Sequence, residues 1–175
     1  MNAKAHRAHC ENCPLRKRSL VPPSMPENAV LAVVGEAPGR TEAIKKVPFI
    51  GPSGALLWGA LDAVGIDRSQ VHVTNAVLCF PGREAPPPEA VECCRDRLMF
   101  ELVKARVKYV LALGNTALHS LVDTEEAISF ARGRWTYVDH IEEDTEYGWW
   151  ALPTYHPAYL LRSETGAQGG REYLW

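Results

Sequence analysis

The loop GEAPG at residues 35–39 combines flexible backbone with nearby carboxylates. Gly35 and Gly39 let the backbone approach a planar ligand closely, because glycine has no Cβ. Glu36 and Glu42 supply the two carboxylates. The loop lacks the Gly-Lys-Ser/Thr ending of a phosphate-binding loop, and it is no dinucleotide-binding G-x-G-x-x-G. The alternative is an ordinary Gly/Pro turn with two solvated acids.

Three side chains elsewhere suit the recognition of a planar polar ligand. Phe49 stands among prolines and glycines, where an aromatic ring is either a core anchor or a stacking surface. The Asn75 amide both donates and accepts hydrogen bonds, so it can read the edge of a base. His156 precedes a proline just beyond an apolar run. A single histidine is more often structural than catalytic, but a His-Pro at the rim of an α/β sheet is better placed for catalysis than most.

The cysteines form a second group that could do chemistry. Cytosolic thiols stay reduced, so five cysteines in a chain without a secretory signal favour metal or cluster binding over disulfides. Cys10 and Cys13 form a C-x2-C pair, and Cys79 and the adjacent Cys93 and Cys94 follow later. Four thiolates suit either a [4Fe-4S] cluster or zinc, and the spacings do not decide between them. One thiol is then left over as a small buried side chain.

Apolar runs alternate with helical patterns along the chain, which favours a single α/β domain over residues 1–175. We expect buried strands over residues 29–34, 71–76, 109–113 and 149–152, and helices over 53–64, 89–105 and 116–121. This order predicts a three-layer α/β/α fold with a central, mostly parallel four-stranded sheet. Ligands bind outside the carboxyl ends of such strands, where Gly35, Asn75, Gly114 and His156 all fall.

The overall charge does not indicate a nucleic-acid-binding protein, because the formal net charge is −2 and the pI is about 6.3. Any contact with phosphates must come from local cations, for which the candidates are Lys45, Lys46, Arg95, Arg97 and Arg162. The alternative is an ordinary solvated face, which we favour for Arg95 and Arg97. No apolar run approaches the roughly 20 residues that span a bilayer, so we expect a cytoplasmic protein. We further expect it to act as a monomer.

Five motifs in this order resemble the family 4 uracil-DNA glycosylases: GEAPG at 35–39, PFIGPSGALL at 48–57, TNAVLC at 74–79, ALGNTA at 112–117 and YHPAYLLR at 155–162. The similarity covers nearly the whole chain from Cys10 to Arg162. It implies an enzyme that flips uracil out of single- or double-stranded DNA, hydrolyses its N-glycosidic bond and leaves an abasic site. It also implies an N-terminal cluster-binding segment at residues 8–20.

The resemblance assigns roles to individual residues. Glu36 would stabilise the developing sugar cation or place the water, and His156 would stabilise the departing uracil. Glu42, Phe49, Asn75 and the backbone at Gly35 and Ala37 would surround the base, with Phe49 stacking on it and Asn75 reading its edge. Leu160 would fill the vacated base stack and Arg162 would contact DNA. The ligands of a [4Fe-4S] cluster would be Cys10, Cys13, Cys79 and Cys94.

The chain departs from the family pattern at three places. The loop between Cys79 and Cys94 is one residue shorter, which makes Cys93 the alternative fourth ligand. Arg40-Thr41 and Phe80 replace residues common in the family. The stretch 171–175 precedes a terminal helix in relatives, so we expect a shortened element there. The rival functions are a same-fold DNA-binding protein, a glycosylase for another deaminated base, and a metal or iron-sulfur protein without glycosylase activity.

Overall fold

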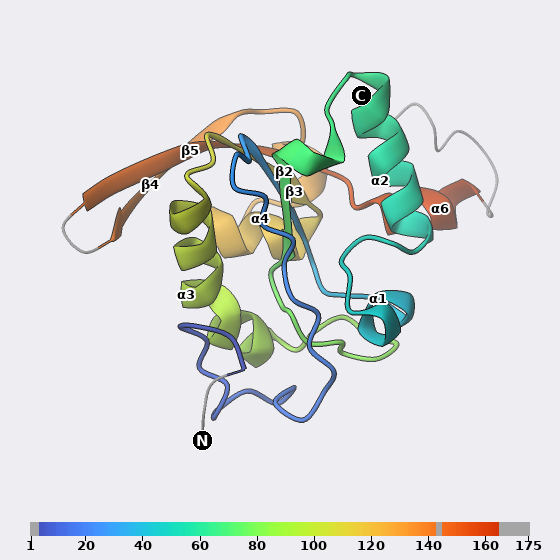
Figure 1. Ribbon diagram of the computed structural model, residues 1–175, viewed down its shortest axis with the longest axis vertical. Coiled ribbons are helices and arrows are strands. Elements are labelled where there is room, and N and C mark those ends of the chain that lie inside the picture. Colours follow the sequence, from blue (N-terminus) through green and yellow to red (C-terminus); the bar gives the residue numbers. More distant parts are fainter. Residues whose placement is uncertain (1–3, 143–144, 165–175) are drawn as a thin grey trace.

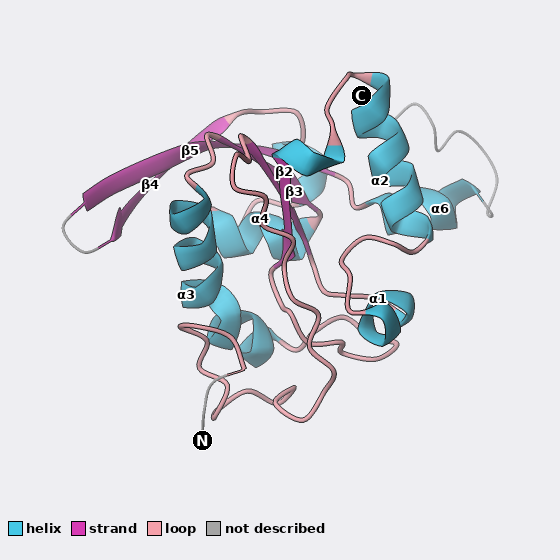
Figure 2. Cartoon of the chain, in the orientation of Figure 1, coloured by secondary structure: helices cyan, strands magenta, loops and turns pink. Residues whose placement is uncertain are grey.

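The computed structural model describes residues 4–142 and 145–164, which form strands and helices of an α/β fold (Figures 1 and 2). The strands are β1 Leu31–Gly35, β2 Val71–Asn75, β3 Tyr109–Leu113, β4 Thr136–Glu142 and β5 Thr145–Thr154. The α-helices are α1 Arg40–Lys45, α2 Pro52–Ala63, α3 Pro88–Ala105, α4 Asn115–Leu121, α5 Ile128–Ala131 and α6 Pro157–Glu164, and a 3-10 turn, η1, spans Arg68–Gln70. The stretch 171–175 lies outside the described residues.

The sheet has five strands in the order β2-β1-β3-β5-β4. The first four are parallel, while β4 pairs antiparallel with β5 at the edge. The expected α/β fold with a mostly parallel sheet is confirmed, but the expected strand number of four is corrected to five. Strand β4 escaped prediction because Thr136–Glu142 mixes polar and apolar residues, as suits an edge strand with one face toward the core.

Alternate residues of β1 face opposite layers, which makes the sheet the middle of three. Ala32 and Val34 pack in the core formed with α3 and α4, which includes Leu98 of α3. Val33 packs instead with α2, in a cluster that contains Leu57. Figure 1 shows α3 and α2 on opposite sides of the strands. The continuous apolar run of β1 is thus explained by burial on both faces.

The N-terminal segment lies along the outer edge of β2. The Val21 N–H donates to the Leu78 carbonyl at 2.9 Å, and the Ser24 N–H donates to the Val73 carbonyl at 2.9 Å. Leu20 forms an antiparallel bridge with Cys79. These bonds satisfy an otherwise open strand edge, and they bring the C-x2-C segment to the later cysteines.

Two helical details differ from the expectation. Helix α2 begins at Pro52 with Gly51 as its N-cap, one residue before Ser53, because proline is favoured at the first helical position. Helix α1, in the loop after β1, was not predicted. Among the described residues, no helix has the length and apolar character needed to cross a bilayer.

Candidate functional site

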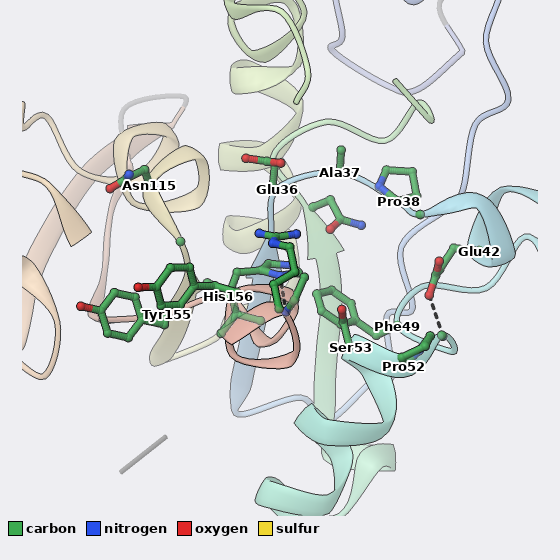
Figure 3. A pocket seen from close by; sticks show the side chains of 18 of the residues that line it. Glu36, Ala37, Pro38, Glu42, Phe49, Pro52, Ser53, Asn115, Tyr155 and His156 are labelled. Atoms are coloured by element: carbon green, nitrogen blue, oxygen red, sulfur yellow. Dashed lines mark hydrogen bonds between the residues drawn. The ribbon is translucent and has the colours of Figure 1, made fainter. Parts of the chain in front are cut away.

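A cavity of about 610 Å³ opens at the carboxyl ends of the parallel strands (Figure 3). Its walls come from the end of β2 and from the segments that follow β1, β3 and β5, as the position of the strand ends predicts. The lining includes Glu36, Ala37, Glu42, Phe49, Asn75, His156 and Arg162. Seven residues of the predicted site therefore meet in one place.

Gly35 makes room for the base-recognition side chains rather than lining the cavity itself. A Cβ at this position would lie 2.5 Å from Asn75 Oδ1 and 2.6 Å from Phe49 Cζ. Gly35 pairs with Asn75 in the β1–β2 register, so the amide and the ring converge over its Cα. The function of the glycine is therefore to let two side chains approach each other, which differs from the expected approach of backbone to ligand.

The backbone of Phe49 adopts a left-handed conformation, with φ of 52°. This conformation is uncommon for a bulky residue and persists only where its surroundings hold it. The Trp58 indole N–H donates to the Phe49 carbonyl at 2.9 Å. The next two backbone N–H groups, of Ile50 and Gly51, donate to Glu42 Oε1 at 3.1 and 2.7 Å. Glu42 thus holds the Phe49 loop with the same carboxylate that faces the cavity.

His156 is held as a neutral hydrogen-bond donor. The Ala158 N–H donates to His156 Nδ1 at 3.1 Å, which places the ring proton of the neutral imidazole on Nε2. Burial lowers the pKa of His156; the charge of Glu36 opposes this shift and that of Arg162 adds to it. The ring centroids of His156 and Phe49 are 6.1 Å apart. The site therefore offers an Nε2–H donor close to an aromatic face.

Glu36 is fixed by the first turn of α4. The Thr116 hydroxyl donates to Glu36 Oε2 at 2.6 Å, a short charge-assisted bond between the loop after β1 and α4. Gly114, which precedes this helix, has φ of 86° and would place a Cβ 3.3 Å from His156 Cβ. Helix α4 thus positions the carboxylate, and the turn before it leaves space for the imidazole.

One residue of helix α6, Leu160, lies in a different environment from the one expected. Leu160 is only 1% exposed, so it packs inward and does not project toward a DNA stack. Tyr159 lies on the open side of the helix, 50% exposed, and stacks on Tyr155 with ring centroids 5.0 Å apart. Arg162 is exposed and lines the cavity, as a DNA contact requires. The wedge assignment to Leu160 is therefore corrected.

Three of the four expected cluster ligands lie in one buried group. Cys13, Cys79 and Cys94 pack together with Leu15, Val77 and Ala90, and Cys93 contacts this group from its edge. Burial raises the pKa of Cys79 to about 11, and the Cys94, Cys13 and Cys10 thiols also raise it. Cys10 is less buried but close enough to act on that thiol.

The thiols are not arranged at ligand distances. In residues 4–142 and 145–164, no group of three or more His, Cys, Asp or Glu side chains has the geometry to hold a metal ion. The donor set nevertheless suits a soft metal or an iron-sulfur cluster: several thiols share an apolar pocket, where coordination would replace their protons.

Two of the candidate cations, Arg97 and Lys46, are hydrogen-bonded to other groups of the protein. Arg97 is 1% exposed and donates to the carbonyls of Asn75 and Ala76, so the solvated face that we favoured for it is wrong. The Lys46 ammonium donates to the Ser19 hydroxyl and, at 3.1 Å, to the Leu20 carbonyl. The local positive charge at the cavity comes instead from residues such as Arg162.

Sequence reasoning missed Thr116, Tyr159 and the buried role of Arg97. Thr116 carried a signal, since it lies in the first turn of a helix that directly follows a strand end. Arg97 also carried one: it shares the helical stripe of Cys94 and Glu101, three residues before it and four after it, which faces the core. No comparable signal separates Tyr159 from Leu160.

Comparison with known proteins gives consistent similarities. A family model described as "Uracil DNA glycosylase superfamily" matches residues 22–173. The chain is 35% identical to a Type-4 uracil-DNA glycosylase of Archaeoglobus fulgidus over 159 residues, 87% of this chain and 78% of the relative. Proteins of the same description from Thermotoga maritima and Pyrobaculum aerophilum are 32% and 31% identical, over 89% and 88% of this chain and 80% of each relative.

Proposed function

Because the chain belongs to the uracil DNA glycosylase superfamily, and within it to the type-4 uracil-DNA glycosylases, we propose that it hydrolyses the N-glycosidic bond of uracil in DNA and leaves an abasic site. One feature of the cavity carries this proposal: an aromatic face, an amide and a neutral imidazole donor converge there from Phe49, Asn75 and His156. These are the groups that a flipped pyrimidine needs.

Recognition of uracil falls to Asn75. Its amide group can donate to O4 of uracil and accept from N3–H. Cytosine presents a donor where uracil presents the O4 acceptor, so the wrong base would leave buried polar groups unpaired. Asn75 is 3% exposed, and among the described residues no group is hydrogen-bonded to its side-chain amide. The amide is therefore available to a ligand.

Catalysis falls to His156 and Glu36. Cleavage of the N-glycosidic bond leaves positive charge on the sugar and negative charge on uracil. The His156 Nε2–H donates to uracil O2 as its charge develops, and the Glu36 carboxylate stabilises the sugar cation and orients the water that attacks C1′. The hydrogen bond from Thr116 keeps one oxygen of Glu36 fixed and leaves the other for this task.

DNA is held by the rim of the cavity. Arg162 lies where it can pair with a phosphate next to the flipped nucleotide. The exposed ring of Tyr159, rather than the buried Leu160, is placed to contact the neighbouring bases. We propose that one copy of the chain acts on uracil in either single- or double-stranded DNA, in the cytoplasm.

The four thiols Cys10, Cys13, Cys79 and Cys94 would hold a [4Fe-4S] cluster, with zinc as the alternative. Such a cofactor would anchor the fold and not act on the base, since none of these four cysteines lines the cavity. Cys94 is preferred over Cys93 since it is the buried member of the pair. Bound there, the group would tie the N-terminal segment to α3.

The proposal is tested by incubating anaerobically purified protein with oligonucleotides that carry one uracil in a single strand, opposite guanine or opposite adenine. Alkali cleavage at the uracil position reveals an abasic site. Matched oligonucleotides with cytosine or thymine at that position should stay intact. No cleavage at the uracil position above background, in any of the three substrates and with cluster-loaded protein, would refute the proposed function.

A further inference from the structure

A buried charge network joins α3 to the strand end that carries Asn75. Arg97 Nη1 donates to Glu101 Oε2 at 2.9 Å and to Thr74 Oγ1 at 3.1 Å. The Thr74 hydroxyl donates to the same oxygen of Glu101 at 2.9 Å. Arg97 Nη2 donates to the carbonyls of Asn75 and Ala76 at 2.8 and 2.7 Å. A single side chain therefore grips two consecutive carbonyls at the end of β2.

The position of these carbonyls explains why an arginine is present. Strand β2 is an edge of the sheet, so the carbonyls on its outer side need partners from outside the sheet. Backbone N–H groups of the N-terminal segment donate to the carbonyls of Val73 and Leu78. The carbonyls of Asn75 and Ala76, which lie between Val73 and Leu78 in the chain, accept hydrogen bonds from Arg97 instead. The planar guanidinium suits this position because it presents several donors in a fixed geometry.

The other side of this strand end is held by β1. The Ala76 N–H donates to the Gly35 carbonyl at 2.8 Å, and the Val77 N–H donates to the Glu36 carbonyl at 3.0 Å. The peptide between Asn75 and Ala76 is thus clamped from both sides. Fixing this peptide fixes the direction of the Asn75 Cα–Cβ bond, and so the point from which the amide reaches the cavity.

A buried ion pair contributes little net stability, because removing both charges from water costs free energy. Replacing a buried ion pair by apolar residues of similar size is often neutral or stabilising, so its presence points to orientation. Burial alone would raise the pKa of Glu101, but His72, Arg97 and Thr74 bring it below its usual value. The pair is therefore charged, and its attraction holds the guanidinium in place.

We infer that Arg97 is a positioning residue for base recognition: it fixes the backbone at Asn75 and thereby sets how tightly the site binds uracil. This inference rests on the proposed function and deepens it, because it names what controls the base-reading amide. Arg97 itself lies behind the cavity wall and touches no substrate.

The test compares Arg97→Lys with the paired change Arg97→Met/Glu101→Leu. Lysine keeps the charge beside Glu101 but lacks the fork that reaches two carbonyls. The paired change removes both charges together, so neither is left buried alone. Lys104→Met is the control, since it removes a cation from the exposed face of the same helix. Thermal unfolding confirms that each variant is folded at the assay temperature.

The readouts separate base binding from DNA binding. We expect the inhibition constant of free uracil to rise about tenfold in Arg97→Lys, the size of one well-made hydrogen bond, while affinity for abasic-site DNA stays within about twofold. The control should match wild type in both. In an Asn75→Ala background, the same arginine change should add less than about twofold, because it acts through a side chain that is already gone.

Unchanged inhibition by uracil in both Arg97 variants would overturn the inference, as would equal losses of uracil and abasic-DNA affinity. An undiminished effect in the Asn75→Ala background would also overturn it, since Arg97 would then act by another route. Wild-type protein is measured first: if it neither excises uracil nor binds it, the proposed function fails. An active wild type with insensitive Arg97 variants rejects the inference alone.

Discussion

The Ala158 backbone N–H donates to Nδ1 of His156 at 3.1 Å, within the first turn of α6. A nitrogen that accepts a hydrogen bond carries no proton, so the proton of the neutral ring is on Nε2. The helix start thus selects the tautomer that can donate into the cavity. This single bond links the strand-to-helix turn after β5 to the proposed stabilisation of the departing base.

Removal of the imidazole should abolish most of the activity. We expect His156→Ala to lower kcat by roughly 10²–10³-fold, the usual loss when one donor to a developing anion is deleted. The melting temperature should change little, because the ring is only partly buried. Single-turnover uracil release measures the effect. His119→Ala, at an exposed histidine that bonds the Glu126 carbonyl, is the control and should retain full activity.

The pH dependence should follow the lowered pKa of His156. Neutral imidazole is the active form, so excision should hold as pH falls through 6.5, the ordinary value, and decline only below the lower folded-state pKa. The unfolded chain takes up a proton near pH 6.5 that the folded chain refuses, so stability falls as pH drops through that value.

His156→Gln removes this titration. On acidification below pH 6.5, the wild type should therefore lose more unfolding free energy than the variant does. Denaturant unfolding at pH 5.5 and pH 8 measures it. A wild type that gains stability relative to the variant on acidification would contradict the lowered pKa.

Gly35→Ala should damage both fold and site. The added Cβ meets Asn75 Oδ1 and Phe49 Cζ at 2.5 and 2.6 Å, so one of these side chains must move. We expect a loss of about 1–3 kcal/mol in unfolding free energy, as for other overpacked positions, together with weaker uracil binding. Gly59→Ala is the matched control. That Cβ meets nothing within 4 Å, and alanine should stabilise α2 by roughly 0.5–1 kcal/mol.

Thr116→Val should lower kcat and leave the inhibition constant of free uracil unchanged. The substitution keeps the shape of the side chain but removes the hydroxyl that donates to Glu36. A charge-assisted hydrogen bond contributes about 1.5–3 kcal/mol, so a loss of at least tenfold is expected. Thr116→Ser keeps the hydroxyl and should recover most of the rate. Equal rates in the valine and serine variants would exclude this role of Thr116.

The cysteines can be ranked by iron and sulfide content of anaerobically purified protein. We expect about four irons per chain in wild type and in Cys93→Ser, and a marked loss in Cys94→Ser. The physical reason is burial, since Cys94 lies inside the buried cluster that contains Cys13 and Cys79, and Cys93 lies at its edge. Zinc without iron or sulfide in the wild type would instead support the alternative metal, and retention of iron in Cys94→Ser would make Cys93 the ligand.

The sheet and the meeting of distant residues at its edge could be predicted from the sequence. Runs such as Leu31–Gly35 and Tyr109–Leu113 are apolar along their length because parallel strands are buried on both faces. Parallel strands end at one edge, so residues after each run must gather there. Side-chain packing does not alter this convergence, and Glu36, Asn75 and His156 indeed line one cavity.

The features that escaped prediction depend on tertiary partners. The helical stripe of α3 directs Arg97 toward the core, but the Asn75 and Ala76 carbonyls that it binds belong to another element, which the sequence of α3 alone does not reveal. Leu160 and Tyr159 are neighbours on a short helix, and which of them faces the core is decided by how α6 packs beside α2. The dual role of Glu42 likewise depends on the path of the Phe49 loop.

The most direct measurement quantifies free uracil released from a single-uracil oligonucleotide by wild type and by Asn75→Ala, each at equal cluster content. The structural account predicts that wild type releases one uracil for each abasic site formed, with multiple turnovers, and that the variant loses most of this release while remaining folded. Release of uracil by the variant at the wild-type rate, or no release by loaded wild-type protein, would contradict it.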